Sequence, residues 1–375
     1  MENLLFISNI SSRVDAFSKA AIYAAKECGL NFHYASNWSD APEGQLREDE
    51  KTYNITIHDV DINRSPVSKD NRKAYEEIRD IVEECDIRFI HCNTPVGGVI
   101  GRLMDKRVKK VIYEAHGFHF YKGAPPVNWG LYYPIEKFLA KKTDAIITIN
   151  KDDYLIAKKR FHPRSKIYYV PGVGIELEQW QQKSDRDVRD ELGYSDDDFV
   201  VLAVGRLEKN KNCKALVEAA GLIRDEHVKI AFCGDGEDKQ MLQDLAEELD
   251  ISDRVKFLGN RTDMVDIYHM ADCFVLASFR EGLSRSIMEA MACGLPCIVA
   301  DIRGNRDLVD PNGGFLFDPK DPAELTECLY EIYGSEELQK SMSEYNLKKI
   351  KQFSFEIVVK KLVKIYKEQF GIVTG

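Results

Sequence analysis

The chain is built from short apolar runs rich in β-branched and aromatic residues that alternate with longer amphipathic stretches. Seven such runs lie in the first half, at 4–10, 32–36, 53–58, 87–92, 110–115, 144–150 and 166–171. Five more lie in the second half, at 199–205, 228–234, 255–259, 273–278 and 296–300. This alternation is typical of parallel sheets joined by crossover helices. We therefore expect an α/β protein with a separate strand-and-helix series in each half.

A boundary between two domains is predicted near residue 173. The 375 residues exceed what one hydrophobic core usually organises. The segment VPGVGIE, in which Pro171, Gly172 and Gly174 break both periodicities, separates the two series. The predicted parts are a domain over 1–172, a second over 173–353, and a helix over 354–375. That last helix repeats apolar residues on one face and is expected to cross back to the first domain.

Charge and cysteine content narrow the classes of protein that fit. The net charge of −10 argues against nonspecific nucleic-acid binding. The nine cysteines form no CxxC pair or zinc-ligand spacing, and we interpret them as buried thiols in a reducing compartment. The start of the chain resembles a first strand more than a signal peptide, and no run of eighteen apolar residues occurs. A cytoplasmic protein is expected.

One basic segment stands out in an otherwise acidic chain. Residues 88–174 hold 16 Lys and Arg against 6 Asp and Glu, an excess of ten positive charges. Each positive charge near an anionic leaflet is worth roughly 1 kcal/mol. Peripheral attachment to the inner face of the cytoplasmic membrane is one expectation, and a solvated face of helices is the alternative.

The stretch FREGLSRSIMEAMACGLP, beginning at residue 279, carries the clearest candidate site. Glu281 and Gly282 follow a predicted strand, at the sheet edge where open α/β proteins bind ligands. A helix starting between Leu283 and Ser286 would present backbone N–H groups to an anion, and Gly282 would let a phosphate approach. Glu289 lies about two turns further on. The two carboxylates could hold sugar hydroxyls, or they could be solvated helix charges.

Two earlier strand ends carry further candidates. The strand ending at Gly205 is followed by Arg206 and Lys211, which together could neutralise a diphosphate, or could belong to a charged surface turn. The sequence CGDGED places Gly234 after the next strand. It lacks the third glycine of G-x-G-x-x-G, so a tight turn is the favoured interpretation there.

In the first half, His116 stands at the end of a predicted strand in YEAHGFHFYKGAPP. An imidazole at that position could hydrogen-bond a sugar hydroxyl or a leaving group. An isolated histidine is as often structural.

These motifs resemble those of family 4 glycosyltransferases, which have the GT-B fold. EGLSRSIMEAMACGLP resembles the family's E-x7-E signature and GRLEKNK resembles its diphosphate loop. EAHGFHFYKGAP resembles the subgroup that builds bacterial capsule, O-antigen and lipid-linked oligosaccharides. The resemblance implies two Rossmann-like domains facing each other across a cleft, with acceptor bound by the first and nucleotide-sugar donor by the second. It also implies a retaining transfer without a metal ion or other cofactor.

The resemblance assigns roles to individual residues. His116, Arg206, Lys211 and Glu281 would act on the donor sugar and diphosphate, and Glu289 would hold the ribose. The other donor-binding residues would be Gly205, Gly234, Asn260, Arg261, Gly282, Leu283 and Ser284. The donor would be a nucleotide diphosphate-sugar, with UDP as the expected nucleotide, and the acceptor a saccharide on a polyprenyl diphosphate.

Two other functions fit the same fold. An isomerase similar to UDP-N-acetylglucosamine 2-epimerases would release UDP without an acceptor. A non-catalytic nucleotide-sugar-binding protein would lack the diphosphate pair or Glu281, and this chain has all three residues.

Overall fold

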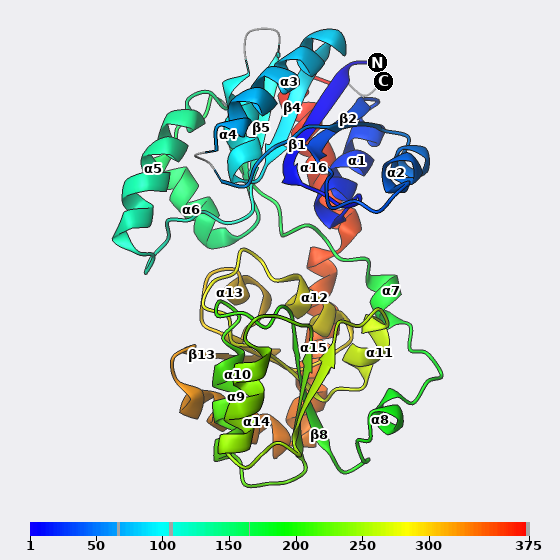
Figure 1. Ribbon diagram of the computed structural model, residues 1–375, viewed down its shortest axis with the longest axis vertical. Coiled ribbons are helices and arrows are strands. Elements are labelled where there is room, and N and C mark those ends of the chain that lie inside the picture. The colour runs from blue at the N-terminus through cyan, green and yellow to red at the C-terminus, as the bar shows by residue number, and fades with distance from the viewer. Residues whose placement is uncertain (66–67, 105–107, 165, 373–375) are drawn as a thin grey trace. The chain divides into compact units, whose positions relative to one another are not determined.

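The computed structural model describes residues 1–65, 68–104, 108–164 and 166–372 and divides them into two units. Unit 1 contains Met1–Gly174 together with the chain from Phe355 onward, and unit 2 contains Ile175–Ser354. The first boundary between the two units, after Gly174, therefore lies directly at the end of the Gly172–Gly174 segment in which the sequence predicted a domain boundary. Figure 1 shows both units as sheets flanked by helices.

Unit 1 is built on a seven-stranded parallel sheet in the order β3-β2-β1-β4-β5-β6-β7. Its strands are β1 (Asn3–Ile10), β2 (Asn31–Asn37), β3 (Thr56–Asp59), β4 (Ile87–Asn93), β5 (Lys110–Ala115), β6 (Ala145–Thr148) and β7 (Lys166–Tyr169). Its helices are α1 (Ala16–Glu27), α2 (Gln45–Tyr53), α3 (Asp70–Glu84), α4 (Pro95–Leu103), α5 (Pro126–Ala140), α6 (Lys151–Arg160) and α16 (Phe355–Phe370).

Both faces of this sheet are buried. Leu4 and Phe6 of β1 point into a core shared with α1 and α16, whereas Leu5 and Ile7 point into a core shared with α3 and α4. This burial on both sides explains why the strands appear in the sequence as continuous apolar runs. The parallel order also places the carboxyl ends of neighbouring strands at one edge.

The last helix confirms the expected return to the first domain. α16 packs within unit 1, where the ring of Phe370 stacks on Phe89 with centroids 4.1 Å apart. Tyr366 and Val358 are almost fully buried in the same core. The apolar face read from the sequence is thus the face that closes one side of the sheet.

Unit 2 has a six-stranded parallel sheet in the order β10-β9-β8-β11-β12-β13. Its strands are β8 (Phe199–Val204), β9 (Val228–Cys233), β10 (Val255–Gly259), β11 (Cys273–Leu276), β12 (Cys297–Ala300) and β13 (Gly314–Phe317). The helices are α7 (Leu177–Gln181), α8 (Val188–Glu191), α9 (Cys213–Leu222), α10 (Lys239–Glu248), α11 (Met264–His269), α12 (Arg285–Ala292), α13 (Asn305–Leu308), α14 (Pro322–Tyr333) and α15 (Glu336–Lys349), followed by the 3-10 turn Ile350–Phe353.

Two strands differ from the sequence prediction. β13 was not predicted, because its four residues are too short to show a period. A Cβ on its first residue, Gly314, would lie 1.8 Å from the carbonyl oxygen of Cys297, so glycine permits the close approach to β12. β3 begins only at Thr56, because α2 runs to Tyr53 and Asn54 turns the chain with a φ of 47°.

The cysteines are only partly as expected, because the sequence predicted buried thiols and four of them are half-buried. All nine cysteines lie in the described residues as free thiols, five of them buried. Within the described ranges, no helix is both long and apolar enough to cross a bilayer.

Candidate functional site

Two loops of unit 2 meet at the carboxyl ends of β8 and β11. These strands are neighbours in the sheet, so the loops that follow them leave from the same edge. The Nζ atom of Lys211 lies 2.8 Å from Oε1 of Glu281, and their side chains are only 22% and 14% exposed. The structure thus brings together two candidates that are 70 positions apart in the sequence.

Two asparagines hold these loops together. The side-chain amide of Asn210 donates to the carbonyl oxygen of Arg280 at 3.1 Å, and the Phe279 N–H donates to the Asn210 carbonyl at 2.9 Å. Asn212 donates to the carbonyl oxygens of Ala277 and Pro319, at 3.2 and 2.7 Å. Asn212 has a φ of 53°, a conformation that asparagine tolerates better than most residues. Sequence analysis missed both residues.

Arg206 and Gly205 line a pocket beside this pair. Lys211, Phe232 and Val275 also contribute to the wall of this pocket. The Arg206 side chain is 76% exposed, and its Nε atom lies 3.9 Å from a Glu208 oxygen. Arg206 is therefore held only weakly, whereas Lys211 is fixed by its carboxylate.

Glu289 is fixed on α12 by two donors. The Tyr268 hydroxyl donates to one carboxylate oxygen at 2.9 Å, and Arg285 Nε donates to the other at 2.9 Å. Burial raises the pKa of Glu289, and these two partners oppose that effect only in part. Tyr268 itself is fully buried. A carboxylate held in this way is positioned to accept hydrogen bonds from a pair of hydroxyls.

The predicted helix start is confirmed, because α12 begins at Arg285 with Ser284 as its N-cap. The Ser284 hydroxyl pairs with the Ser286 hydroxyl at 2.9 Å. Gly282 and Leu283 precede the cap and rest against Gly304. A Cβ on Gly304 would lie 2.2 Å from the Gly282 carbonyl oxygen, so this glycine sets the path of the loop. No motif in the sequence indicates that contact.

Gly234 has a structural explanation. A Cβ there would lie 2.0 Å from the carbonyl oxygen of Gly205, and the Gly205 N–H donates to the Cys233 carbonyl. The glycine thus allows the ends of β8 and β9 to pack closely, which agrees with the tight turn favoured from the sequence.

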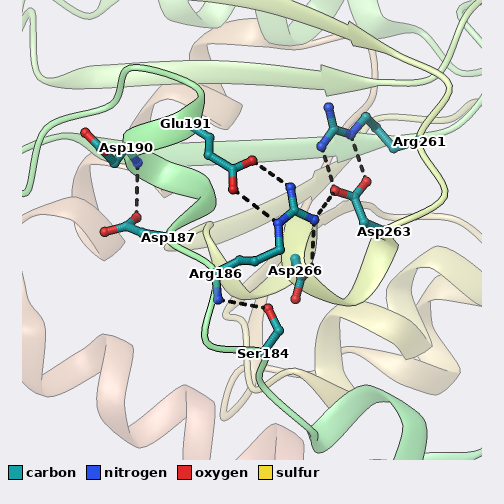
Figure 2. A network of polar contacts seen from close by, with 8 residues as sticks. All are labelled: Ser184, Arg186, Asp187, Asp190, Glu191, Arg261, Asp263 and Asp266. Carbon is teal, nitrogen blue, oxygen red and sulfur yellow. Dashed lines mark hydrogen bonds and ion pairs between the residues drawn. The ribbon is translucent and has the colours of Figure 1, made fainter.

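Arg261 lies in a network of ion pairs, whereas Asn260 is exposed. Figure 2 shows Arg261 facing Asp263, with Nε and Nη2 at 2.8 and 2.6 Å from its carboxylate oxygens. Arg186 contacts the same carboxylate at 3.0 Å and also binds Glu191. Hydrogen bonds from the two arginines lower the pKa of Asp263 to about 2. Arg261 is thus already paired within unit 2.

His116 lies in unit 1, against Phe17 and Glu114. Its ring stacks on Phe17 with centroids 4.1 Å apart, and its Nε2 atom is 3.8 Å from Oε1 of Glu114. Burial lowers the pKa of His116. Glu114 also lies 3.0 Å from Nε2 of buried His91, whose Nδ1 is 2.6 Å from the Tyr366 hydroxyl.

Glu114 is a buried carboxylate between two histidines. Burial alone would raise its pKa, but the hydrogen bond from His91 and the neighbouring His116 outweigh that effect and hold the pKa below its usual range. The sequence pointed to His116 and missed the residues that surround it.

Two parallel-sheet Rossmann-like units with this arrangement of strand-end loops define a GT-B enzyme. Residues 184–349 match the family described as Glycosyl transferases group 1, and residues 18–150 match the family described as Glycosyl transferase 4-like. The chain belongs to the family 4 type of glycosyltransferases, and it is a GT-B glycosyltransferase.

The relatives and the solved structures agree with this assignment. The chain is 34% identical to EpsD of Bacillus subtilis, over 97% of this chain and 96% of that protein. It is 31% identical to the UDP-Gal:alpha-D-GlcNAc-diphosphoundecaprenol alpha-1,3-galactosyltransferase of Escherichia coli, over 67% of each chain. The fold is similar to HepE of Anabaena, solved in complex with UDP, with a TM-score of 0.80 at 18% identity over 98% of this chain and 100% of that one. It is also similar to sucrose-phosphate synthase of Thermosynechococcus elongatus, with a TM-score of 0.83 at 17% identity over the full length of both chains.

Proposed function

We propose that this glycosyltransferase moves a hexose or N-acetylhexosamine from a UDP-sugar to a saccharide on a polyprenyl diphosphate, in bacterial surface polysaccharide or glycan assembly. The observation that carries the proposal is the partly buried pair Lys211 and Glu281 at the ends of β8 and β11. A cation and a carboxylate on adjoining loops suit a substrate that joins a diphosphate to a sugar. The UDP in the HepE complex and the diphosphoundecaprenol acceptor in the Escherichia coli relative's name support this choice.

The proposed reaction retains the anomeric configuration. The bond between the sugar C1 and the oxygen of the β-phosphate breaks as Lys211 and Arg206 take up the growing charge on the diphosphate. The acceptor hydroxyl oxygen forms its bond to C1 from the same face, and its proton passes to the leaving phosphate oxygen. Amides at the start of α12 would add to the stabilisation. Because two cations and the helix end supply the positive charge, we propose that no metal ion takes part.

Glu289, Glu281 and His116 would hold the hydroxyl groups. The Glu289 carboxylate would accept from the ribose, and Glu281 would contact the donor sugar once the diphosphate replaces it beside Lys211. His116 would hydrogen-bond the sugar or the leaving group. The donor-binding set is completed by Gly205, Gly234, Asn260, Arg261, Gly282, Leu283 and Ser284.

The test of function is product analysis with purified protein. Thermal shift against UDP, GDP, ADP and their sugars identifies the donor, because a ligand bound only by the folded state raises its stability. NMR of the product from that donor and a diphosphoprenyl saccharide should then show a new glycosidic bond with the donor's anomeric configuration. UDP release and an epimerised sugar without acceptor would establish the isomerase instead, and binding without turnover would establish a binding protein.

We also propose that unit 1 attaches peripherally to the inner face of the cytoplasmic membrane. α5 packs Trp129, Tyr132 and Tyr133 against the core of unit 1. Its opposite face exposes large apolar side chains at intervals of four, four and three residues, namely Val127, Leu131, Ile135 and Phe138, which are 68%, 52%, 43% and 58% exposed. Such spacing forms one stripe of the helix.

A basic side chain lies at one end of this stripe, in a basic part of the chain. Lys142 Nζ lies 5.6 Å from the centre of the Phe138 ring, and the excess of ten positive charges in residues 88–174 includes it. Lys106 and Arg107 of that segment lie outside the described residues. An apolar stripe in a basic part of the chain suits an anionic lipid surface.

Flotation with anionic and neutral vesicles tests the attachment. Binding should require anionic lipid and weaken with salt, and Leu131→Ser with Phe138→Ser should reduce it. Leu222→Ser is the matched control, because Leu222 is 56% exposed but belongs to unit 2. Absence of binding to anionic vesicles at low salt would refute the attachment and leave the transfer reaction untouched.

A further inference from the structure

Three metal-ligand side chains from distant parts of the sequence meet at the β3 edge of the unit 1 sheet. His33 lies on β2, His58 on the edge strand β3, and Cys85 is the C-cap of α3. The Nδ1 atom of His33 is 3.0 Å from Nε2 of His58, and the two rings are nearly parallel at 13°. The two nitrogens and the Cys85 sulfur all lie within 4.8 Å of one another.

The fold explains why these residues meet. In the parallel pairing of β2 with β3, His58 lies opposite Ala35, two positions along the strand from His33. Side chains two positions apart share one face of a strand. α3 covers that face, and its end is fixed because the Asn3 side chain donates to the Cys85 carbonyl at 2.6 Å. Asp86, with a φ of 43°, then turns the chain into β4.

The spacing of the donor atoms fits a small divalent cation. Zinc–nitrogen bonds of about 2.0–2.1 Å and a zinc–sulfur bond of about 2.3 Å place tetrahedral ligand atoms roughly 3.4 to 3.6 Å apart. The two imidazole nitrogens, 3.0 Å apart, are close to that spacing. The Cys85 sulfur lies within 4.8 Å of both nitrogens, so a small movement brings it to the same spacing. All three side chains are partly exposed, so an ion can enter and a water molecule can complete the four ligands.

The surroundings favour a cation further. The negative charge of Glu50 interacts electrostatically with His58, and that of Glu84 with Cys85. Residues 1–87 as a whole carry 17 Asp and Glu against 10 Lys and Arg.

We propose that His33, His58 and Cys85 form a binding site for Zn²⁺ or a similar late first-row divalent ion. The two imidazole nitrogens and the Cys85 thiolate are the ligands, and the thiol proton is released to solvent when the ion binds. Two imidazoles and one thiolate are the donor set that zinc accepts readily, whereas Mg²⁺ and Ca²⁺ require oxygen ligands.

The bound ion ties three elements of unit 1 together. It joins β3, the edge strand, to β2 and to the end of α3, which otherwise meet through packing and backbone pairing. None of the three ligands belongs to the donor-binding candidates, which we expect to work without a metal. Occupancy therefore acts on the stability of unit 1 and not on the transfer step.

Cobalt spectroscopy of the full-length, chelator-treated protein tests the site. Adding Co²⁺ should produce one equivalent of tetrahedral complex, with visible d–d bands and a near-ultraviolet thiolate-to-cobalt band, and one equivalent of Zn²⁺ should remove both. Cys85→Ser should abolish the charge-transfer band. His58→Asn should weaken Co²⁺ binding by more than about 100-fold, because losing a ligand costs more than losing a residue that only hydrogen-bonds to a ligand.

Two matched variants and a melting experiment complete the test. Cys328→Ser removes another partly exposed thiol, and His227→Asn removes another partly exposed imidazole, and both should bind Co²⁺ like the wild type. Zn²⁺ should raise the melting temperature of the wild type and of these controls, but not that of Cys85→Ser. No thiolate band in the wild type, or the same band in Cys85→Ser, would overturn the proposal. Either result would leave the transfer assay, run with a chelator present, unchanged.

Discussion

Lys211 and Glu281 form an ion pair of 2.8 Å between the loops after β8 and β11. The pair is more buried than most surface ion pairs, and Asn210 and Asn212 fix both of its loops. In the protein without substrate, each charge is therefore neutralised by the other. An incoming diphosphate can take over the lysine, which frees the carboxylate for a sugar hydroxyl, so the two charges are expected to work as one unit.

Lys211→Ala should lower kcat/KM by about 100-fold or more, since losing one preorganised donor to a developing negative charge typically costs that much. Lys209→Ala changes an exposed lysine of the same loop and should stay within about threefold of wild type. Steady-state UDP release in the presence of acceptor measures both. Equal effects of the two substitutions would mean that general positive charge, and not the position of Lys211, matters.

Glu289→Gln should change how stability depends on pH. Burial raises the pKa of Glu289, so the folded protein holds this proton more tightly than the unfolded chain does. The wild type therefore loses stability as the pH rises from the ordinary value of 4.5 through the raised pKa, whereas the glutamine variant has no proton to lose.

The melting temperature of Glu289→Gln relative to wild type should thus increase between pH 4.5 and pH 7.5. Glu237→Gln, at an exposed position, provides the baseline. A difference that stays constant with pH would contradict the assigned shift. Donor binding should weaken in Glu289→Gln at pH values above the raised pKa, because the wild-type carboxylate then offers two acceptor oxygens and the amide only one.

Gly304→Ala should impair both folding and activity. Its Cβ would meet the Gly282 carbonyl oxygen at 2.2 Å and so displace the loop before α12. Gly44→Ala is the matched control, because Gly44 has nearly the same φ, +82° against +79°, with open space around it. Gly44→Ala should cost only the strain of a left-handed alanine, about 1–2 kcal/mol. Activity and urea unfolding of both variants measure the difference, and equal losses would show that the contact with Gly282 is unimportant.

Tyr366→Phe should destabilise unit 1 by about 1–3 kcal/mol, because it leaves a buried acceptor without its donor. The Glu114 carboxylate beside His91 Nε2 keeps the proton on that nitrogen, so Nδ1 accepts from the Tyr366 hydroxyl. Thermal unfolding followed by circular dichroism measures the loss. Tyr23→Phe, at a residue 44% exposed in the same unit, should melt like the wild type.

The sequence predicted most of the fold because burial on both faces leaves a strong signal. β1, with Leu4 and Leu5 in opposite cores, is a continuous apolar run, and the Pro and Gly residues around 172 mark the change of unit. β13 escaped prediction because four residues carry no period. Lys211 and Glu281 were each predicted to follow a strand end, and they meet because β8 and β11 are neighbours in the sheet whose carboxyl ends share one edge.

Residues that act through tertiary contacts could not be predicted. Tyr268, Asn212 and Gly304 do not stand out in the sequence. Only the packing shows that Tyr268 holds Glu289, that Asn212 holds the Lys211 loop, and that Gly304 holds the Gly282 loop. Arg261 was predicted from the resemblance to the family, but its pairing with Asp263 depends on a loop geometry that the resemblance does not show.

The return of α16 to unit 1 has a consequence for synthesis on the ribosome. Unit 2 is one uninterrupted stretch of chain, from Ile175 to Ser354, so all of its strands have been made before α16 is complete. Unit 1 begins first but lacks the helix bearing Val358, Tyr366 and Phe370, so α1 covers one side of its sheet only in part until translation ends. The half that emerges earliest is thus the half that matures last, and a nascent chain halted before residue 355 should display a folded second half beside an unfinished first one.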